Sequence, residues 1–147
     1  MPLKEAPVID FLLVGGGLAS ATAAETLRAA GAEGSIAVLC AENTLPYYRP
    51  PLSKEFLLKG PDQSKILIHD PSFYRDRGIE IHLGSPVRQV DVDGRRIETD
   101  GGDRFRFGKL LIATGASVHR LSVQGFSSGV ARRRLRTCPW RRNGLTA

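Results

Sequence analysis

The sequence predicts an α/β fold in which an antiparallel meander interrupts a parallel sheet flanked by helices. An apolar run over residues 8–14 leads directly into a glycine-rich turn, an alanine-rich stretch and a second apolar run over residues 35–41. Further along, alternating segments are separated by Asp-Gly turns that begin at Asp93 and Asp100. Buried parallel strands are apolar on both faces, whereas alternation with Asp-Gly turns is typical of hairpins. The chain therefore combines both kinds of sheet.

The glycine-rich turn has the spacing of a dinucleotide-binding loop, with Gly15, Gly17 and Ser20 at its three positions. A glycine at position 15 can adopt turn angles that a side chain forbids, and one at position 17 lets backbone approach a pyrophosphate. Ser20 stands where Gly or Ala is usual, and it is small enough to pack helix against strand. The helix predicted from Leu18 to Gly31 would point free N–H groups and its positive dipole end at the anion.

The second apolar run ends in an acidic residue, Glu42. A carboxylate at this point of a βαβ unit can accept hydrogen bonds from the hydroxyls of an adenosine ribose. It also disfavours a ribose 2′-phosphate, so this loop suits FAD or NAD and not NADP. An ordinary strand-to-helix turn would need no such acid, and we therefore prefer the nucleotide interpretation.

The remaining chain alternates further helices and strands. We expect a short helix capped by Ser53, a helix capped by Asp70, and a strand that begins at Ile79. The meander follows, and a buried strand ends in the Ala-Thr-Gly sequence. The expected ranges are 53–58 and 70–78 for the helices, and 79–83, 87–92, 95–99, 104–107 and 109–116 for the strands.

Composition limits the possible functions. The formal net charge of +6 comes from six arginines after residue 130, so residues 1–130 are neutral and give no sign of nucleic-acid binding. No apolar stretch approaches twenty residues, which predicts no membrane-spanning helix, and we expect a cytoplasmic protein. Cys40 and Cys138 form no Cys-x-x-Cys pair, and the three histidines show no metal-ligand spacing. We expect Cys40 to be buried in the second strand, and we predict no metal site.

Three segments together resemble a known family: residues 14–19, the string Pro-Tyr-Tyr-Arg-Pro-Pro-Leu-Ser-Lys over 46–54, and residues 111–115. They are similar to the N-terminal part of the FAD-dependent pyridine nucleotide oxidoreductases. The resemblance covers about residues 8–125 and is strongest to the ferredoxin, putidaredoxin and rubredoxin reductase branch, which includes apoptosis-inducing-factor-like proteins. The Arg-Pro-Pro-Leu-Ser-Lys part separates this branch from the disulfide reductases, which carry a redox cysteine pair after the second strand.

The resemblance implies a partial Rossmann-like FAD-binding domain over residues 1–125, and a reductase that passes electrons from NAD(P)H through FAD to a ferredoxin- or rubredoxin-like partner. The pyrophosphate would lie at the glycine loop, the ribose at the acid after the second strand, and the adenine at the backbone that opens the meander. The basic residues of the 46–54 string would lie near the flavin and pyrophosphate, and no catalytic residue is assigned. The implied FAD-binding residues are Gly15, Gly17, Leu18, Ala19, Glu42, Arg49, Lys54, Val87, Ala113, Thr114 and Gly115.

No second glycine fingerprint follows Gly115, so we expect this chain to lack the NAD domain that the family uses. Residues 126–147 form a basic tail that we expect to be disordered or translated off-frame, with the chain a truncated and inactive fragment. A nucleotide-binding fragment without turnover and a basic-tailed binding module are the alternatives. The sequence does not distinguish NADH from NADPH and does not identify the electron acceptor.

Overall fold

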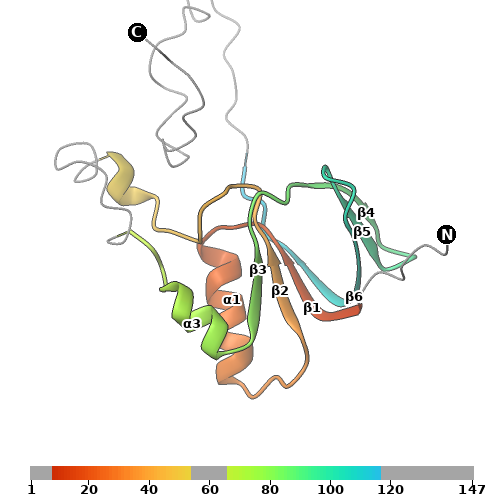
Figure 1. The fold of residues 1–147 in the computed structure, drawn as a ribbon, viewed down its shortest axis with the longest axis horizontal. Helices are drawn as coiled ribbons and strands as arrows, with labels where there is room; N and C mark the ends of the chain where they lie inside the picture. Colours follow the sequence, from red (N-terminus) through yellow and green to blue (C-terminus); the bar gives the residue numbers. More distant parts are fainter. Residues whose placement is uncertain (1–7, 54–65, 117–147) are drawn as a thin grey trace, which may run out of the picture. The chain divides into compact units, whose positions relative to one another are not determined.

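A computed structural model describes residues 8–53 and 66–116, which fall into two compact units. The first unit comprises the described residues up to Tyr47 and those from Leu67 to Gly115, and it holds every strand of the sheet (Figure 1). The described part of the second unit contains a 3₁₀ turn, Pro50–Ser53. The elements of the first unit are β1 (Val8–Val14), α1 (Leu18–Ala29), β2 (Ile36–Leu39), α3 (Pro71–Asp76), β3 (Ile79–His82), β4 (Val87–Asp91), β5 (Arg96–Thr99) and β6 (Arg104–Ile112).

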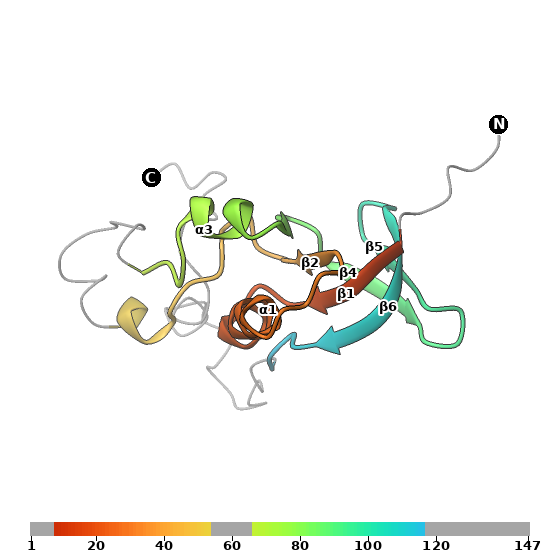
Figure 2. The same ribbon diagram turned by 90° about the horizontal axis from the view of Figure 1, so that it is seen from below.

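The six strands form one mixed sheet in the order β3-β2-β1-β6-β5-β4. Strands β3, β2, β1 and β6 are parallel, and β6-β5-β4 are antiparallel. Figure 2 shows β1 and β6 side by side with their arrowheads pointing the same way. The predicted combination of a parallel sheet, helices and an antiparallel meander is confirmed.

Each face of the parallel strands has its own apolar core. On one face, Ala24 of α1 and Tyr74 of α3 pack with Leu13, Ile36 and Val38. The opposite face packs against the meander, through a cluster made of Ile9, Leu12, Val14, Ala37, Leu39, Ile97, Phe105 and Phe107. All four residues of β2 are buried, as expected of a strand that is apolar on both sides. Strands β1 and β2 therefore have the helices on one face and meander residues packed on the other.

Strand β6 corrects two expectations. The sequence indicates a meander strand over 104–107 and a separate strand over 109–116, but the structure contains one continuous strand that ends at Ile112. Its first part pairs with β5 in antiparallel register, and residues 106–112 pair with β1 in parallel register. The second part is also not buried, because Leu111 is 39% and Ile112 58% exposed. An apolar run predicted burial, but no described element covers these side chains.

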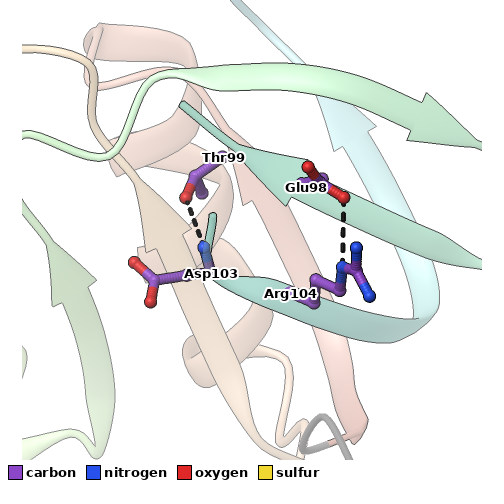
Figure 3. Close-up of polar contacts among 4 residues, drawn as sticks. All are labelled: Glu98, Thr99, Asp103 and Arg104. Carbon is purple, nitrogen blue, oxygen red and sulfur yellow. Dashed lines mark hydrogen bonds and ion pairs between the residues drawn. The ribbon is translucent and has the colours of Figure 1, made fainter. Parts of the chain in front are cut away.

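The turn between β5 and β6 is closed by side-chain contacts as well as by backbone (Figure 3). The Asp103 N–H donates to Thr99 Oγ1 at 3.1 Å, and the Thr99 N–H donates to the Asp103 carbonyl at 2.9 Å. Arg104 Nε donates to Glu98 Oε2 at 3.0 Å across the same strand pair. These contacts set the register of the hairpin, which positions β6 for its pairing with β1.

The helices begin and end close to their expected positions. Helix α1 is followed by Gly31 with φ +80°, the left-handed backbone that ends helices at glycine. Helix α3 follows Asp70 and starts at Pro71, but the Asp70 side chain makes no capping hydrogen bond, which corrects part of that prediction. The helix predicted over 53–58 lies almost wholly outside the described residues, which contain the 3₁₀ turn Pro50–Ser53 at this point.

One arginine joins the ends of the two helices. Arg28 Nε donates to the Arg77 carbonyl at 2.8 Å, and one terminal nitrogen donates to the Gly78 carbonyl at 2.8 Å. Its other terminal nitrogen donates to the carbonyls of Ala32 and Gly34, at 2.5 and 2.8 Å. The planar guanidinium can satisfy several carbonyls at once. Arg28 therefore ties the end of α1 to the turn that leads into β3.

Candidate dinucleotide-binding site

The four parallel strands end in register at one edge of the sheet. Val14 is paired with Leu39 on one side and Ile112 on the other, and Leu39 is paired with His82. The segments that follow these strands therefore leave from neighbouring positions. Ligands of open α/β sheets bind outside the carboxyl ends of the strands, so this edge is the candidate site.

The glycine turn is held between the two neighbouring strands of β1. The Gly15 N–H donates to the Leu39 carbonyl at 2.9 Å, and the Ala113 N–H donates to the Val14 carbonyl at 2.8 Å. Gly15 has φ +123°, a conformation that residues with a side chain rarely adopt. A Cβ at this position would lie 2.7 Å from the Ala113 carbonyl carbon. Glycine is therefore required both by the turn and by contact with the Ala-Thr-Gly segment.

Gly16 has a different reason to be glycine. A Cβ on Gly16 would lie 2.9 Å from both Cβ and Sγ of Cys40, which follows β2. Cys40 is fully buried, as its sequence context predicts. Burial raises the pKa of the Cys40 thiol to about 12, with a further contribution from the charge of Glu42. The thiol is therefore a packing group beneath the glycine turn and not a nucleophile.

Gly17 begins α1 and faces open space. It occupies the N-cap position with extended backbone and supplies no side-chain cap. The first N–H groups of a helix have no partner inside the helix, so the start of α1 offers donors and a positive dipole end. A Cβ on Gly17 would have no atom within 4 Å among the described residues. This space suits an anion, and Leu18 and Ala19 beside it are exposed.

Ser20 faces the other way and is completely buried, as its packing role in the loop requires. Its hydroxyl, however, has no hydrogen-bond partner among the described residues. The Ser20 side chain is therefore small enough for the third position of the loop, but its hydroxyl makes no hydrogen bond to the described residues around it.

Glu42 lies two residues beyond Cys40, on the segment that leaves β2, and is half-buried. Its backbone carbonyl accepts a hydrogen bond from the Gly84 N–H at 3.1 Å, and the Cys40 carbonyl accepts one from the Ser85 N–H at 2.7 Å. Its side chain accepts a hydrogen bond from the Tyr47 hydroxyl, 2.8 Å from Oε2. The acid is thus fixed through both backbone and side chain.

Val87 opens β4 just after the segment that is bonded to Glu42. It pairs with Thr99, and a register shift follows between Val87 and Gln89. A bulge of this kind interrupts the ladder and leaves backbone groups of the bulged strand without strand partners. The adenine contact expected of the Val87 backbone stays a prediction.

The structure brings most of the predicted residues to one edge of the sheet. The glycine loop, Glu42 and the segment from Ala113 to Gly115 meet there through the pairing of β2, β1 and β6. Arg49 belongs to the second compact unit, where its carbonyl accepts a hydrogen bond from the Leu52 N–H at 3.0 Å. Lys54 and the tail over 126–147 lie outside the described residues.

Sequence reasoning assigns no functional role to Gly16 or Cys40, and for Tyr47 it leaves open both stacking near a ligand and packing within the loop. Gly16 and Cys40 are far apart in the chain, so only the strand pairing shows that one must be small because of the other. Tyr47 contacts Glu42 within a loop, where no periodic pattern gives a signal. No helix among the described residues is long and apolar enough to cross a membrane. In the same residues, no group of three His, Cys, Asp or Glu side chains could hold a metal ion.

Fold and site together define a dinucleotide-binding α/β domain. The sequence model of the pyridine nucleotide-disulphide oxidoreductase family matches residues 9–141, and the chain belongs to that family. One relative is the ferredoxin reductase subunit of 5,5'-dehydrodivanillate O-demethylase from Sphingobium sp. (strain NBRC 103272 / SYK-6), 40% identical over 81% of this chain. Another is the rubredoxin-NAD(+) reductase of Pseudomonas putida, 39% identical over 78% of this chain. The relatives are thus of the reductase branch that the sequence predicts.

Solved structures of the same branch share the fold. The ferredoxin reductase for the CYP199A2 system of Rhodopseudomonas palustris matches 78% of this chain with a TM-score of 0.73 and 36% identity. The putidaredoxin reductase in its covalent complex with putidaredoxin matches 86% of this chain with a TM-score of 0.73 and 28% identity. The chain spans 28% and 29% of these two structures, and 29% and 30% of the Sphingobium and Pseudomonas relatives.

Proposed function

We propose that this chain forms the pyrophosphate- and adenosine-binding part of an FAD site in an NAD(P)H-dependent reductase of ferredoxin or rubredoxin type. The observation that carries the proposal is the open start of α1 at Gly17. It lies between the Ala113 segment and the strand that leads to Glu42. Phosphates favour such a helix start, and a carboxylate at the end of the next strand favours a ribose without a 2′-phosphate.

In this proposal each part of FAD has its own residues. The pyrophosphate binds the N–H groups around Gly17, Leu18 and Ala19, and the adenosine ribose binds Glu42. The adenine contacts the backbone at Val87. Ala113, Thr114 and Gly115 line the FAD site in the same proposal. The positions near the flavin and pyrophosphate that the resemblance gives to Arg49 and Lys54 stay predictions. Bound FAD supplies the chemistry, because a flavin accepts a hydride and returns electrons singly.

The activity belongs to a protein of the relatives' length. Residues 1–147 contain one glycine fingerprint, and the chain covers about three-tenths of the relatives. We therefore assign NAD(P)H oxidation and electron transfer to a ferredoxin- or rubredoxin-like protein to the whole reductase. The relatives' names refer to ferredoxin and rubredoxin reductases, which supports this choice of partner. The chain alone is expected to bind FAD, or its ADP half, without turnover.

The Gly17→Asp variant tests the proposal because it separates folding from binding. Aspartate is a preferred N-cap residue, and the open space accepts its side chain, so the free energy of unfolding is expected to rise. The same carboxylate occupies the phosphate position with the wrong charge. We expect the affinity for FAD, measured by calorimetry, to fall by at least about tenfold, or about 1.4 kcal/mol.

Gly17→Asn is the matched control, because asparagine also caps helices but carries no charge. We expect it to raise stability like Gly17→Asp and to retain more FAD affinity. A Gly17→Asp protein that binds FAD as tightly as the unmodified chain would show that the phosphates bind elsewhere. An unmodified chain that is colourless and takes up neither FAD nor ADP would refute the proposed function itself.

A further inference from the structure

The structure of the loop after β2 assigns a role to Tyr47, and we propose that Tyr47 is the positioning residue for the ribose-binding carboxylate of Glu42. The inference rests on the proposed function, because it concerns how the ribose end of that site is prepared. It adds a residue that contacts no part of the ligand in the proposal and acts through Glu42.

The contact itself is short and sheltered. The Tyr47 hydroxyl donates to Glu42 Oε2 at 2.8 Å, a normal length for a hydrogen bond between oxygens. The Tyr47 side chain is 3% exposed, and Glu42 is half-buried. A hydrogen bond to an ionised group in such surroundings is stronger than one between neutral groups in water. The carboxylate is therefore held in one orientation.

Both partners are anchored through their backbones. Tyr47 forms an isolated antiparallel bridge with Leu67, and the Ile68 N–H donates to the Pro46 carbonyl at 3.0 Å. The Glu42 carbonyl is bonded to the Gly84 N–H, as described above. The backbone of Tyr47 is thus anchored, and its hydroxyl holds the Glu42 carboxylate. This side-chain hydrogen bond closes the loop over residues 42–47.

This arrangement favours recognition of a ribose diol. A carboxylate has two oxygens and about four lone-pair positions, so the tyrosine can occupy one while the 2′- and 3′-hydroxyls bind others. A glutamate side chain that is free to rotate loses that freedom when the ligand binds. Tyr47 removes part of that entropy loss beforehand, which is preorganisation of the binding group. The phenyl ring of a phenylalanine would pack equally well but would not donate this hydrogen bond to the carboxylate.

The test combines the Tyr47→Phe substitution with a ligand that lacks the ribose hydroxyls. Calorimetry measures the binding of ADP and of 2′,3′-dideoxy-ADP to the unmodified full chain and to the Tyr47→Phe variant. We expect Tyr47→Phe to weaken ADP binding by about tenfold, the order expected for one hydrogen bond to a charged group. Binding of the dideoxy nucleotide should change by less than about twofold, because that ligand has no ribose hydroxyl to donate a hydrogen bond to Glu42.

Tyr74→Phe is the matched control, because the Tyr74 hydroxyl is also buried but has no hydrogen-bond partner among the described residues. It should leave the binding of both nucleotides unchanged. Equal weakening of ADP and dideoxy-ADP by Tyr47→Phe would show a merely structural role and overturn the inference. Unchanged ADP binding would overturn it too. If the unmodified chain binds neither nucleotide, the proposed function fails first, and this inference fails with it.

Discussion

Ser20 occupies the point where α1 packs on the sheet, and its side chain is completely buried. The hydroxyl has no hydrogen-bond partner among the described residues. A buried polar atom without a partner costs about 1–3 kcal/mol, and alanine is also the better helix former. Ser20 therefore fits the third position of the loop by its size, but burial of its unpaired hydroxyl lowers the stability of the fold.

We predict that Ser20→Ala raises the free energy of unfolding by about 1 kcal/mol, because the change removes the unpaired hydroxyl and only one atom of volume. Urea unfolding followed by circular dichroism measures it. Thr99→Val is the contrasting variant, because the Thr99 hydroxyl is buried but accepts the Asp103 N–H at 3.1 Å. Thr99→Val should lower stability by about 1 kcal/mol. A loss of stability in Ser20→Ala would mean that its hydroxyl has a partner after all.

At the scale of elements, Arg28 joins α1 to the turn before β3. Its guanidinium donates to four backbone carbonyls, two that follow α1 and two that follow α3. Those carbonyls lie where helices end and where backbone acceptors need partners. The contact therefore fixes how the helical layer is held against the edge strand of the sheet.

We expect Arg28→Ala to lower the free energy of unfolding by about 3 kcal/mol, because several charge-assisted hydrogen bonds are lost together. Arg28→Lys should recover only part of the loss, since an ammonium group lacks the planar fork. Chemical denaturation of the three proteins gives the comparison. Arg75→Ala is the control on α3, where the 78%-exposed side chain forms an ion pair with the exposed Asp76, and it should change stability by less than about 0.5 kcal/mol. Equal effects at both positions would contradict a special role for Arg28.

The sequence predicts the elements of this fold better than their connections in space. The glycine loop, β2 and Asp-Gly turns depend on local chemistry, so their positions are apparent from the residues alone. The continuity of β6 is not, because Gly108 separates an alternating segment from an apolar one, and a glycine between two such segments resembles a break. A Cβ at Gly108 would lie 2.9 Å from the Asp10 carbonyl oxygen, so this glycine reflects close contact between strands. Such contacts depend on pairing across most of the chain.

The same limit applies to the candidate site. Gly15, Gly17 and Glu42 follow from a known spacing, and the structure places them at one edge of the sheet. The partners of these residues are not predictable from spacing. Asp10, which had no predicted role, accepts hydrogen bonds from the Ser35 N–H and hydroxyl, both at 2.8 Å. These bonds lower the pKa of Asp10, and the contact aligns β1 with the start of β2.

For the whole molecule, the second half of β6 is the exposed feature of the sheet. Strand β5 pairs with Arg104–Arg106 only, so beyond that point β6 has a strand partner on one side among the described residues. Leu111 and Ile112 at this edge are 39% and 58% exposed. An open edge with exposed apolar side chains favours association with other chains. In a protein of the relatives' length, further residues are available to cover it.

We predict that the 147-residue chain self-associates through this edge. The double variant Leu111→Lys/Ile112→Lys should shift the population toward monomer at a given concentration, because charge on an edge strand opposes pairing. Sedimentation velocity over a range of concentrations measures the shift. Val92→Lys is the control, since Val92 is 68% exposed but lies beyond β4 at the hairpin turn. If the control reduces association as much as the double variant, the contact is not made by β6.

The position of β6 also determines the order in which the molecule can fold. It is the last strand among the described residues, yet it lies in the middle of the sheet between β1 and β5. Native contacts between distant parts of a chain form slowly, because the chain must first close a long loop. The turn at Gly15, which is pressed against Ala113, cannot reach its final form on a ribosome until the end of β6 has been synthesised. The glycine loop is therefore synthesised well before the strand that completes it.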